Sequence, residues 1–335
     1  MINVAIIGAS GYTGLELVKI LLNHPKFTIN YIANSTGETK ISDLHPSLKQ
    51  VCELDVQAAN AQEVAANAQL AFLALPHKTS MGFAKELLSL GVKVVDLSAD
   101  YRLERDTYEK HYCAHEDAVN LPKSVYGLPE FYTKEIQNSS LIANPGCYPT
   151  ATLLGLLPFI PYIDTDAPIF VDAKSGVSGA GKKLSEITSY VSVNENIFAY
   201  NPMKHRHAPE ITEKVKLLQN KDISINFVPH LIAATRGMLV SIYATLKQDI
   251  NPQEILLDAY KNENFIRVCD KPVDIKSTAG TNFCDLFAQK NDKALFVSSS
   301  IDNLLRGASS QAVVNANIMH GFDVHCGINS IAYTP

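Results

Sequence analysis

Ile2-Asn3-Val4-Ala5-Ile6-Ile7-Gly8-Ala9-Ser10-Gly11-Tyr12-Thr13-Gly14 is the stretch that decides the fold. Residues 2–7 form an apolar, largely β-branched run that is typical of a strand buried in a parallel sheet. Residues 15–22 have helical apolar spacing. A strand, a glycine turn and a helix in this order favour a dinucleotide-binding turn. The glycine spacing is G-x-x-G-x-x-G and not the usual G-x-G-x-x-G, and a plain strand–helix turn is the alternative. Gly8 would make the tight turn, Gly11 would admit a pyrophosphate and Gly14 would let the helix pack closely.

A second strand is predicted over residues 27–33, and it ends at Asn34-Ser35-Thr36. A NAD-binding domain usually carries an acidic residue there to hold the ribose 2′-hydroxyl. Here the first acid is Glu38. Small polar residues leave room for a 2′-phosphate, which favours NADP. Lys40 is a candidate for the positive charge, since no arginine stands at this strand end.

Strands and helices continue to alternate, with strands predicted over 69–75 and 92–97 and a helix over 80–90. Loops at the carboxyl ends of parallel strands form the ligand crevice of such sheets. Ser98 and Arg102 follow one of these strands, so we expect them to face a substrate. A surface ion pair is the alternative for Arg102. Residues 104–135 are interpreted as an irregular connection, with His111 and His115 at the surface.

Cys147 lies in the stretch Asn144-Pro145-Gly146-Cys147-Tyr148-Pro149-Thr150. A short apolar run at 141–143 indicates a strand end before it, and residues 151–157 indicate a buried helix after it. The unpaired N–H groups and the dipole at a helix N-terminus favour a thiolate. Cys147 is therefore a candidate nucleophile. A buried structural cysteine is the alternative.

The character of the chain changes after Cys147. Residues 169–174, 223–229, 239–246 and 295–301 indicate strands of an antiparallel sheet, so we expect an α+β second domain. Residues 175–181 are interpreted as a flexible loop of small residues. Residues 303–321 have a helical apolar pattern.

His205-Arg206-His207-Ala208-Pro209-Glu210-Ile211 is the second informative stretch. Pro209 marks a helix start, so both histidines are expected just upstream, in an extended segment where residues two apart point the same way. We interpret one of them as a proton relay beside Cys147 and expect the other to be structural. A metal site would need a third ligand, such as Cys147 or Glu210, and we predict none.

Composition limits the classes of function. The chain has 335 residues, 46% of them hydrophobic and 19% charged, which suits two domains with separate cores. A formal net charge of -5 argues against nucleic-acid or membrane-surface partners. The six cysteines are scattered, which fits reduced thiols in a cytosol. We expect a cytoplasmic protein without a signal peptide or membrane span, acting on a small-molecule substrate.

These stretches together resemble the N-acetyl-γ-glutamyl-phosphate reductases of arginine biosynthesis. The motifs occur in family order over nearly the whole chain: GASGYTG (8–14), DLSADYRL (96–103), YGLPE (126–130), NPGCYPTA (144–151), AKSGVSGAG (173–181), HRHAPEI (205–211), PHL and RG within 229–237, and DNLLRGASSQAVVNANIM (302–319). Many members are expected to have an arginine where this chain has Asn34, a departure that concerns cofactor preference and not the fold.

The resemblance implies an α/β architecture: a Rossmann dinucleotide-binding domain, then an α+β catalytic domain like that of the glyceraldehyde-3-phosphate and aspartate-semialdehyde dehydrogenases. Residues 1–146, joined by a returning C-terminal helix from about 303 to 335, would bind NADP. Residues 147–302 would form the catalytic and dimerisation domain of a homodimer or homotetramer.

The resemblance also implies site residues. Cys147 matches the nucleophile, with His207 or His205 as acid and base. The expected cofactor contacts are Gly8, Ser10, Gly11, Tyr12, Thr13, Gly14, Ser35, Ser175, Gly176 and Asn317. The candidates for binding the substrate carboxylate and leaving phosphate are Ser98, Arg102, Asn144, Arg206 and Arg236, among which the guanidinium groups suit both anions.

The implied reaction is the NADPH-dependent reduction of N-acetyl-L-glutamyl 5-phosphate to the 5-semialdehyde and phosphate, through a thioester on Cys147. A lysine-pathway analogue with a carrier-linked substrate one methylene longer is one alternative, since a methylene is worth only about 1–3 kcal/mol in a pocket. HRHAPEI and GCYPT argue against aspartate-semialdehyde dehydrogenase. Intact Cys147 and both histidines argue against a non-catalytic dinucleotide-binding sensor.

Overall fold

The computed structural model of the protein describes residues 1–333. The chain divides into two compact units. The first contains residues 1–145 and 308–329, and the second contains residues 146–307 and the described residues from Ser330 onward. The boundaries predicted from the sequence were after residue 146, for the end of the first domain segment, and at about residue 303, for the start of the returning segment.

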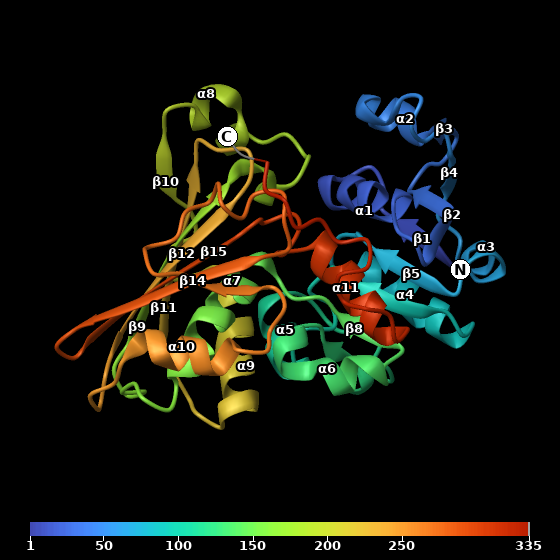
Figure 1. The fold of residues 1–335 in the computed structure, drawn as a ribbon. Helices are drawn as coiled ribbons and strands as arrows, with labels where there is room; N and C mark the ends of the chain where they lie inside the picture. Colours follow the sequence, from blue (N-terminus) through green and yellow to red (C-terminus); the bar gives the residue numbers. More distant parts are fainter. Residues whose placement is uncertain (334–335) are drawn as a thin grey trace. The chain divides into compact units, whose positions relative to one another are not determined.

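The first unit is built on an eight-stranded sheet in the order β3-β4-β2-β1-β5-β6-β8-β7 (Figure 1). All its pairs are parallel except β3 with β4. The strands are β1 (Ile2–Ile7), β2 (Phe27–Asn34), β3 (Thr39–Lys40), β4 (Asp55–Ala58), β5 (Leu70–Leu73), β6 (Lys93–Asp96), β7 (Val125–Tyr126) and β8 (Leu141–Ala143). The predicted parallel sheet is confirmed, because β1, β2, β5 and β6 fall within or beside the predicted segments.

Helices of the first unit connect these strands: α1 (Tyr12–Leu22), α2 (Ile41–Leu44), α3 (Ala61–Asn67), α4 (Thr79–Ser89), α5 (Arg105–His111), α6 (Pro129–Gln137) and α11 (Ser309–Met319). Their apolar faces bury the sheet; Leu17 of α1 and Leu87 of α4 are inaccessible to solvent, as is every residue of the β5 run Leu-Ala-Phe-Leu. The last helix, α11, packs against α1 and α6. It is shorter than the predicted segment 303–321, because residues 303–307 form a turn instead.

The prediction of an irregular connection over residues 104–135 is wrong. This segment contains α5, β7 and the start of α6. The charged and aromatic composition hid α5 in particular, because its buried residue is the aromatic Tyr108 and not an aliphatic side chain. His115 is not a surface residue either, since it is buried and its Nε2 lies 2.7 Å from the carbonyl oxygen of Asp100. His111 is exposed, as predicted.

The second unit is built on a seven-stranded sheet in the order β10-β11-β9-β12-β15-β14-β13. The strands are β9 (Ile169–Gly176), β10 (Ile197–Ala199), β11 (Ile225–Ile232), β12 (Met238–Thr245), β13 (Ile266–Val268), β14 (Cys284–Asn291) and β15 (Ala294–Ile301). The mainly antiparallel sheet is confirmed, with one correction. β9 pairs with β11 in parallel, as does β13 with β14, because a helix or long connection separates each pair in the chain.

Four helices accompany this sheet: α7 (Cys147–Leu156), α8 (Tyr190–Val193), α9 (His207–Gln219) and α10 (Pro252–Tyr260). Helix α7 packs on β12 and β15, α9 on β11, and α10 on β13 and β14. Side chains alternate across the sheet: Val171 and Ile242 are buried, whereas Phe170 and Tyr243 are exposed. Helix α7 is apolar all round and buried along its length, so its N-terminus is held in a fixed position.

Candidate active site

Cys147 is the first residue of α7, with Gly146 as the N-cap in extended conformation. The helix therefore begins four residues earlier than predicted, and the thiol stands directly at its N-terminus. The side chain is partly exposed. The N–H groups of the first turn and the dipole of a ten-residue helix favour the thiolate over the thiol, which makes Cys147 the most suitable candidate nucleophile in the second unit.

The turn before the thiol is tied to α9 by a buried carboxylate. Gly146 donates its N–H to Glu210 Oε1 at 3.1 Å, and Glu210 is almost fully buried. Helices α7 and α9 pack together, so this bond fixes the two helix N-termini relative to one another. From the sequence, Glu210 was considered only as a possible metal ligand. Its hydrogen bond to the Gly146 N–H could not be predicted, because it forms only when α7 and α9 pack together.

The two histidines come together, although not through the predicted geometry. Their ring centroids lie 4.8 Å apart, and the backbone N–H of His207 donates to His205 Nδ1 at 3.2 Å. The segment is not extended: Arg206 has helical dihedrals and His207 is the first residue of α9. The prediction that both rings lie upstream of the helix is therefore wrong for His207.

His205 is enclosed by aromatic rings. Its ring centroid lies 5.5 Å from each of Tyr148, Tyr200 and Phe227. Burial, with the nearby charge of Arg206, lowers the pKa of His205 to about 4. At neutral pH this imidazole is uncharged, and its Nδ1 already accepts a hydrogen bond. Arg206 itself is exposed to solvent.

Tyr148 and Tyr200 form a hydroxyl pair, with their oxygens 2.9 Å apart. Burial raises the pKa of both hydroxyls, and a negative charge on Cys147 would raise both further. Sequence reasoning missed both residues. Tyr148 directly follows Cys147 in the chain, so the motif could have indicated it, whereas Tyr200 comes from the β10–α9 connection.

Arg236 lies in the β11–β12 loop of the second unit, and the backbone at Gly176 lies close to it, since a Cβ built on Gly176 would come within 2.8 Å of the Arg236 backbone nitrogen. The Arg236 side chain donates to Asp302 through Nε at 3.0 Å and Nη2 at 3.2 Å. Ser175 and Gly176 belong to the end of β9, and residues 177–180 form a 3-10 turn, so the prediction of a flexible loop is wrong here. Their roles toward substrate and cofactor stay predictions.

In the first unit the glycine turn has the predicted backbone. Gly8 has a φ of +94°, which a side chain would strain, and Gly11 is the N-cap of α1. A Cβ at Gly14 would lie 2.5 Å from the carbonyl oxygen of Gly8, so this glycine is required for helix α1 to pack on the turn. His45, which the sequence did not indicate, places Nε2 2.7 Å from the carbonyl oxygen of Ala9.

The other residues of this turn, Ser10, Tyr12 and Thr13, are at least partly exposed at the start of α1. Asn34 is buried, and its Oδ1 accepts the N–H groups of Thr36 at 2.9 Å and Gly37 at 2.6 Å. The Asn34 side chain therefore shapes its own turn, and Ser35 is left exposed. The turn and the α1 N-terminus suit a dinucleotide pyrophosphate, because the dipole of α1 favours a negative charge at its N-terminus and a Cβ at Gly11 would have no neighbour closer than 3.8 Å.

Three predicted substrate ligands, Ser98, Arg102 and Asn144, are buried at the carboxyl ends of β6 and β8. Arg102 donates to the carbonyl oxygens of Asn144 and Leu97, each at 2.7 Å, so its alternative interpretation as a surface ion pair is wrong. Asn144 donates to the carbonyl oxygen of Ala308 at 3.1 Å. These bonds hold the loops at the sheet edge, and substrate contacts stay predictions.

Asn317 lies in α11 and is fully buried. Its Oδ1 lies 3.1 Å from His24 Nε2, and its Nδ2 donates to the carbonyl oxygen of Cys326 at 2.9 Å. These contacts anchor the segment after α11. The nicotinamide contact stays a prediction.

Within residues 1–333, no helix is long and apolar enough to cross a membrane. Across the same described residues, histidine, cysteine and carboxylate side chains are not grouped in threes that could hold a metal ion.

Comparison with known proteins agrees with this geometry. A family model described as "Semialdehyde dehydrogenase, NAD binding domain" matches residues 3–139, and one described as "Semialdehyde dehydrogenase, dimerisation domain" matches residues 147–303. Aspartate semialdehyde dehydrogenase II from Vibrio cholerae superposes with a TM-score of 0.72 at 18% identity, covering 96% of this chain and 99% of that one. The Candida albicans enzyme, solved with NADP, has the same TM-score at 15% identity, covering 96% and 98%. The fold and the helix-terminal cysteine define an oxidoreductase of the semialdehyde dehydrogenase class.

Curated relatives narrow the class. The protein named N-acetyl-gamma-glutamyl-phosphate reductase from Sulfurovum sp. (strain NBC37-1) is 65% identical to this chain over the full length of both. The protein of the same name from Wolinella succinogenes is 57% identical to this chain, over 100% of this chain and 99% of the relative. The chain belongs to the N-acetyl-γ-glutamyl-phosphate reductase family. The resemblance inferred from the motifs is confirmed.

Proposed function

We propose that the protein reduces N-acetyl-L-glutamyl 5-phosphate to N-acetyl-L-glutamate 5-semialdehyde and phosphate, in arginine biosynthesis. The observation that carries the proposal is Cys147 at the N-terminus of α7, followed directly by Tyr148. The Tyr148 ring lies 5.5 Å from His205 and 5.8 Å from His207, its hydroxyl pairs with Tyr200, and the chain has full-length relatives named for this reduction.

The chemistry follows from the thiolate. Cys147 Sγ attacks the acyl carbon, the C–O bond to phosphate breaks, and inorganic phosphate leaves with the electron pair. A thioester remains, which accepts hydride where a carboxylate would not. A reduced nicotinamide, when bound, would supply that hydride. Hydride addition to the thioester carbon gives the alkoxide of a thiohemiacetal, which a nearby acid can protonate. The same group takes that proton back, the oxygen re-forms the C=O bond as the C–S bond breaks, and the aldehyde and the Cys147 thiolate are released.

His207 is our choice for the group that moves protons near the sulfur. His205 has its Nδ1 engaged by a backbone N–H and a pKa of about 4, so it is poorly matched to proton transfer near pH 7. Its enclosed ring is suited to positioning the first turn of α9, and hence His207. Arg206 is exposed beside them, and we propose it as a ligand of the substrate carboxylate.

The reverse reaction tests this assignment. Oxidation of N-acetylglutamate semialdehyde should require phosphate, and Cys147→Ser should lose at least 10³-fold in kcat. His207→Asn should lower kcat about 10²-fold and remove one limb of the pH–rate profile, whereas His205→Asn should retain that limb. Near-normal activity of Cys147→Ser would refute the thioester route. Turnover confined to a carrier-linked, longer substrate would refute the substrate assignment.

We propose NADP as the preferred cofactor. Ser35 and Thr36 are exposed at the end of β2, where a NAD-binding domain usually carries a carboxylate, and Lys40 is exposed nearby in the chain. Ser35→Asp should raise the KM for NADPH at least tenfold and lower the KM for NADH, because its carboxylate would repel the 2′-phosphate. An unchanged ratio of the two KM values would argue against this placement.

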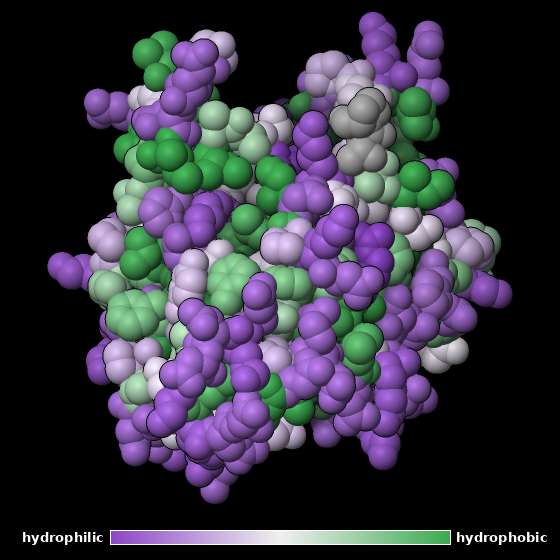
Figure 2. All heavy atoms as spheres, turned by 60° about the vertical axis from the view of Figure 1, so that its left-hand side comes forward, coloured by the Kyte–Doolittle hydropathy of each residue, from purple (hydrophilic) through white to green (hydrophobic). Residues whose placement is uncertain are grey.

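We also propose a homodimer or homotetramer. Large apolar side chains are strongly exposed in residues 184–203 of the second unit, among them Leu184, Ile187, Tyr190, Val191 and Ile197. Figure 2 shows hydrophobic side chains gathered in patches on the face that carries this unit. Contiguous exposed apolar surface marks association sites. Light scattering should give at least twice the mass of one chain, and Val191→Asp should reduce it. A monomer in both cases would refute the proposal.

A further inference from the structure

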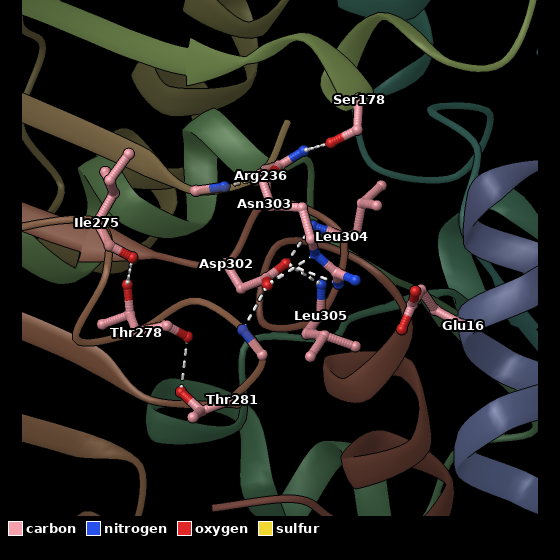
Figure 3. Close-up of polar contacts among 12 residues, drawn as sticks. Glu16, Ser178, Arg236, Ile275, Thr278, Thr281, Asp302, Asn303, Leu304 and Leu305 are labelled. Atoms are coloured by element: carbon pink, nitrogen blue, oxygen red, sulfur yellow. Dashed lines mark hydrogen bonds and ion pairs between the residues drawn. The ribbon is translucent and has the colours of Figure 1, made fainter. Parts of the chain in front are cut away.

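A wholly buried carboxylate stands at the end of β15. Asp302 is inaccessible to solvent and accepts hydrogen bonds from three segments of the second unit, as Figure 3 shows. Its two oxygens receive the Arg236 guanidinium in a bidentate pair, the N–H of Gly280 at 2.7 Å, and the N–H groups of Leu304 and Leu305 at 2.9 and 3.0 Å. Each of these partners is a donor, so both side-chain oxygens must accept, which a carboxylate does and an amide cannot.

The next residue joins two further loops. Asn303 Oδ1 accepts the N–H of Gly237 at 2.8 Å, and its Nδ2 donates to Ser178 Oγ at 3.0 Å. Gly237 follows Arg236 in the β11–β12 loop, and Ser178 lies in the turn after β9. These loops are also paired through their backbones: Ser178 donates its N–H to the carbonyl oxygen of Thr235 at 3.1 Å. Asp302 and Asn303 thus fasten the start of residues 302–307 to a rigid base.

The other end of residues 302–307 contacts the nucleophile. Gly307 donates its N–H to the carbonyl oxygen of Asp302 at 2.9 Å, which closes the turn. A Cβ built on Gly307 would lie 2.6 Å from Cys147 Cβ and 2.6 Å from the carbonyl oxygen of Asn303. The backbone at Gly307 is therefore a wall against which the Cys147 side chain rests, and there is no room for a methyl group between them.

We propose that residues 302–307, which we call the buttress segment, hold the Cys147 side chain in its reactive orientation at the α7 N-terminus, with Asp302 and Asn303 as positioning residues. The inference rests on the proposed role of Cys147. A wall with no free space limits the rotation of the thiolate, and a misplacement of a reacting atom by about 1 Å can cost 10²-fold in rate. We also assign the Arg236 guanidinium to holding the buttress segment through Asp302, rather than to binding the substrate.

Gly307→Ala is the most direct test. The added methyl group must displace Cys147 from the helix terminus, so kcat should fall about 10²-fold while KM changes less than threefold. Alkylation of Cys147 by iodoacetamide, measured by site-resolved mass spectrometry against the partly exposed Cys326, should slow about tenfold at pH 7 and shift to higher pH. Gly82→Ala is the matched control, because a Cβ at Gly82 meets no atom within 4 Å, and it should leave both readouts unchanged.

A pair of variants at Asn303 keeps the proposal testable if Gly307→Ala does not fold. Asn303→Ala removes both side-chain bonds and should slow alkylation of Cys147. Asn303→Asp keeps an acceptor for Gly237 and can accept from Ser178, so it should recover most of the rate. Equal alkylation in all folded variants would overturn the buttress segment. Alkylation needs no substrate, so it tests the buttress segment independently of the proposed function. Failure of the proposed function would be shown by a Cys147→Ser variant that retains activity.

Discussion

A buried acid in the first unit makes the stability of the fold depend on pH. Asp96 ends β6 and is inaccessible to solvent, where it accepts the hydroxyl of Ser98 at 2.7 Å and the N–H of Ser98 at 3.0 Å. Burial, followed by the charge of Asp100, raises the pKa of Asp96 from 3.8 to about 6. The folded protein therefore binds this proton more tightly than the unfolded chain.

The sign of the effect follows from linkage. Asp96 contributes stability that is fully present below pH 3.8 and is lost as the pH rises through about 6, because ionisation in the folded state leaves a charge in a dry site. A rise from 3.8 to about 6 corresponds to about 3 kcal/mol at 1.36 kcal/mol per pKa unit. Of this total, about 2 kcal/mol should be lost between pH 4.5 and pH 7.

Asp96→Asn removes the titration and keeps the size of the side chain. Urea denaturation followed by circular dichroism suits a chain without tryptophan. The stability of the variant relative to the wild type should increase by about 2 kcal/mol from pH 4.5 to pH 7. Asp55→Asn, at an exposed position on β4, is the control and should show no such trend. A difference between Asp96→Asn and the wild type that is independent of pH would refute the reasoning.

Three further changes have defined outcomes. Tyr260→Phe should cost about 1 kcal/mol in urea denaturation at unchanged kcat, because it removes a buried bond to the carbonyl oxygen of Leu154 at 2.6 Å; a loss of activity without a loss of stability would contradict this. Gly14→Ala should weaken NADP binding at least tenfold by calorimetry, since its Cβ would overlap the Gly8 carbonyl, and unaltered affinity would argue against a cofactor at this turn. Lys214→Met should destabilise by up to about 3 kcal/mol, because it removes the nearly buried ammonium that lies 3.0 Å from the Glu213 carboxylate; adding Glu213→Gln should recover much of the loss, and strictly additive costs would exclude a coupled pair.

Sequence periodicity predicted the elements that are long, apolar and regular. The strand over Ile2–Ile7 and the helix after the glycine turn were located within a few residues, because a buried strand and an amphipathic helix leave distinct spacing in the chain. The same reasoning failed between residues 104 and 135. There the buried face of α5 is aromatic and hydrogen-bonded, with the Tyr108 hydroxyl donating to Asp100 at 2.7 Å, and such a face has no simple apolar period.

The candidate site was predicted in part. The NPGCYPT and HRHAPEI motifs identified Cys147 and the two histidines, because these residue types carry the chemistry. The motifs did not indicate which of His205 and His207 is better suited to proton transfer. That choice depends on the surroundings of each ring, since only the folded chain brings Tyr200 and Phe227 around His205 and lowers its pKa.

By itself the sequence determined the order of the elements, the glycine turn and the choice of Cys147 as the candidate nucleophile, all of which depend on neighbours a few residues apart. Only the tertiary structure decided which polar groups are buried together. Asp302 meets Arg236 across 66 residues of chain, and Gly307 reaches Cys147 across a still longer separation. Such contacts depend on the closure of long loops around a packed core, and no local pattern in the chain records which partners that closure brings together.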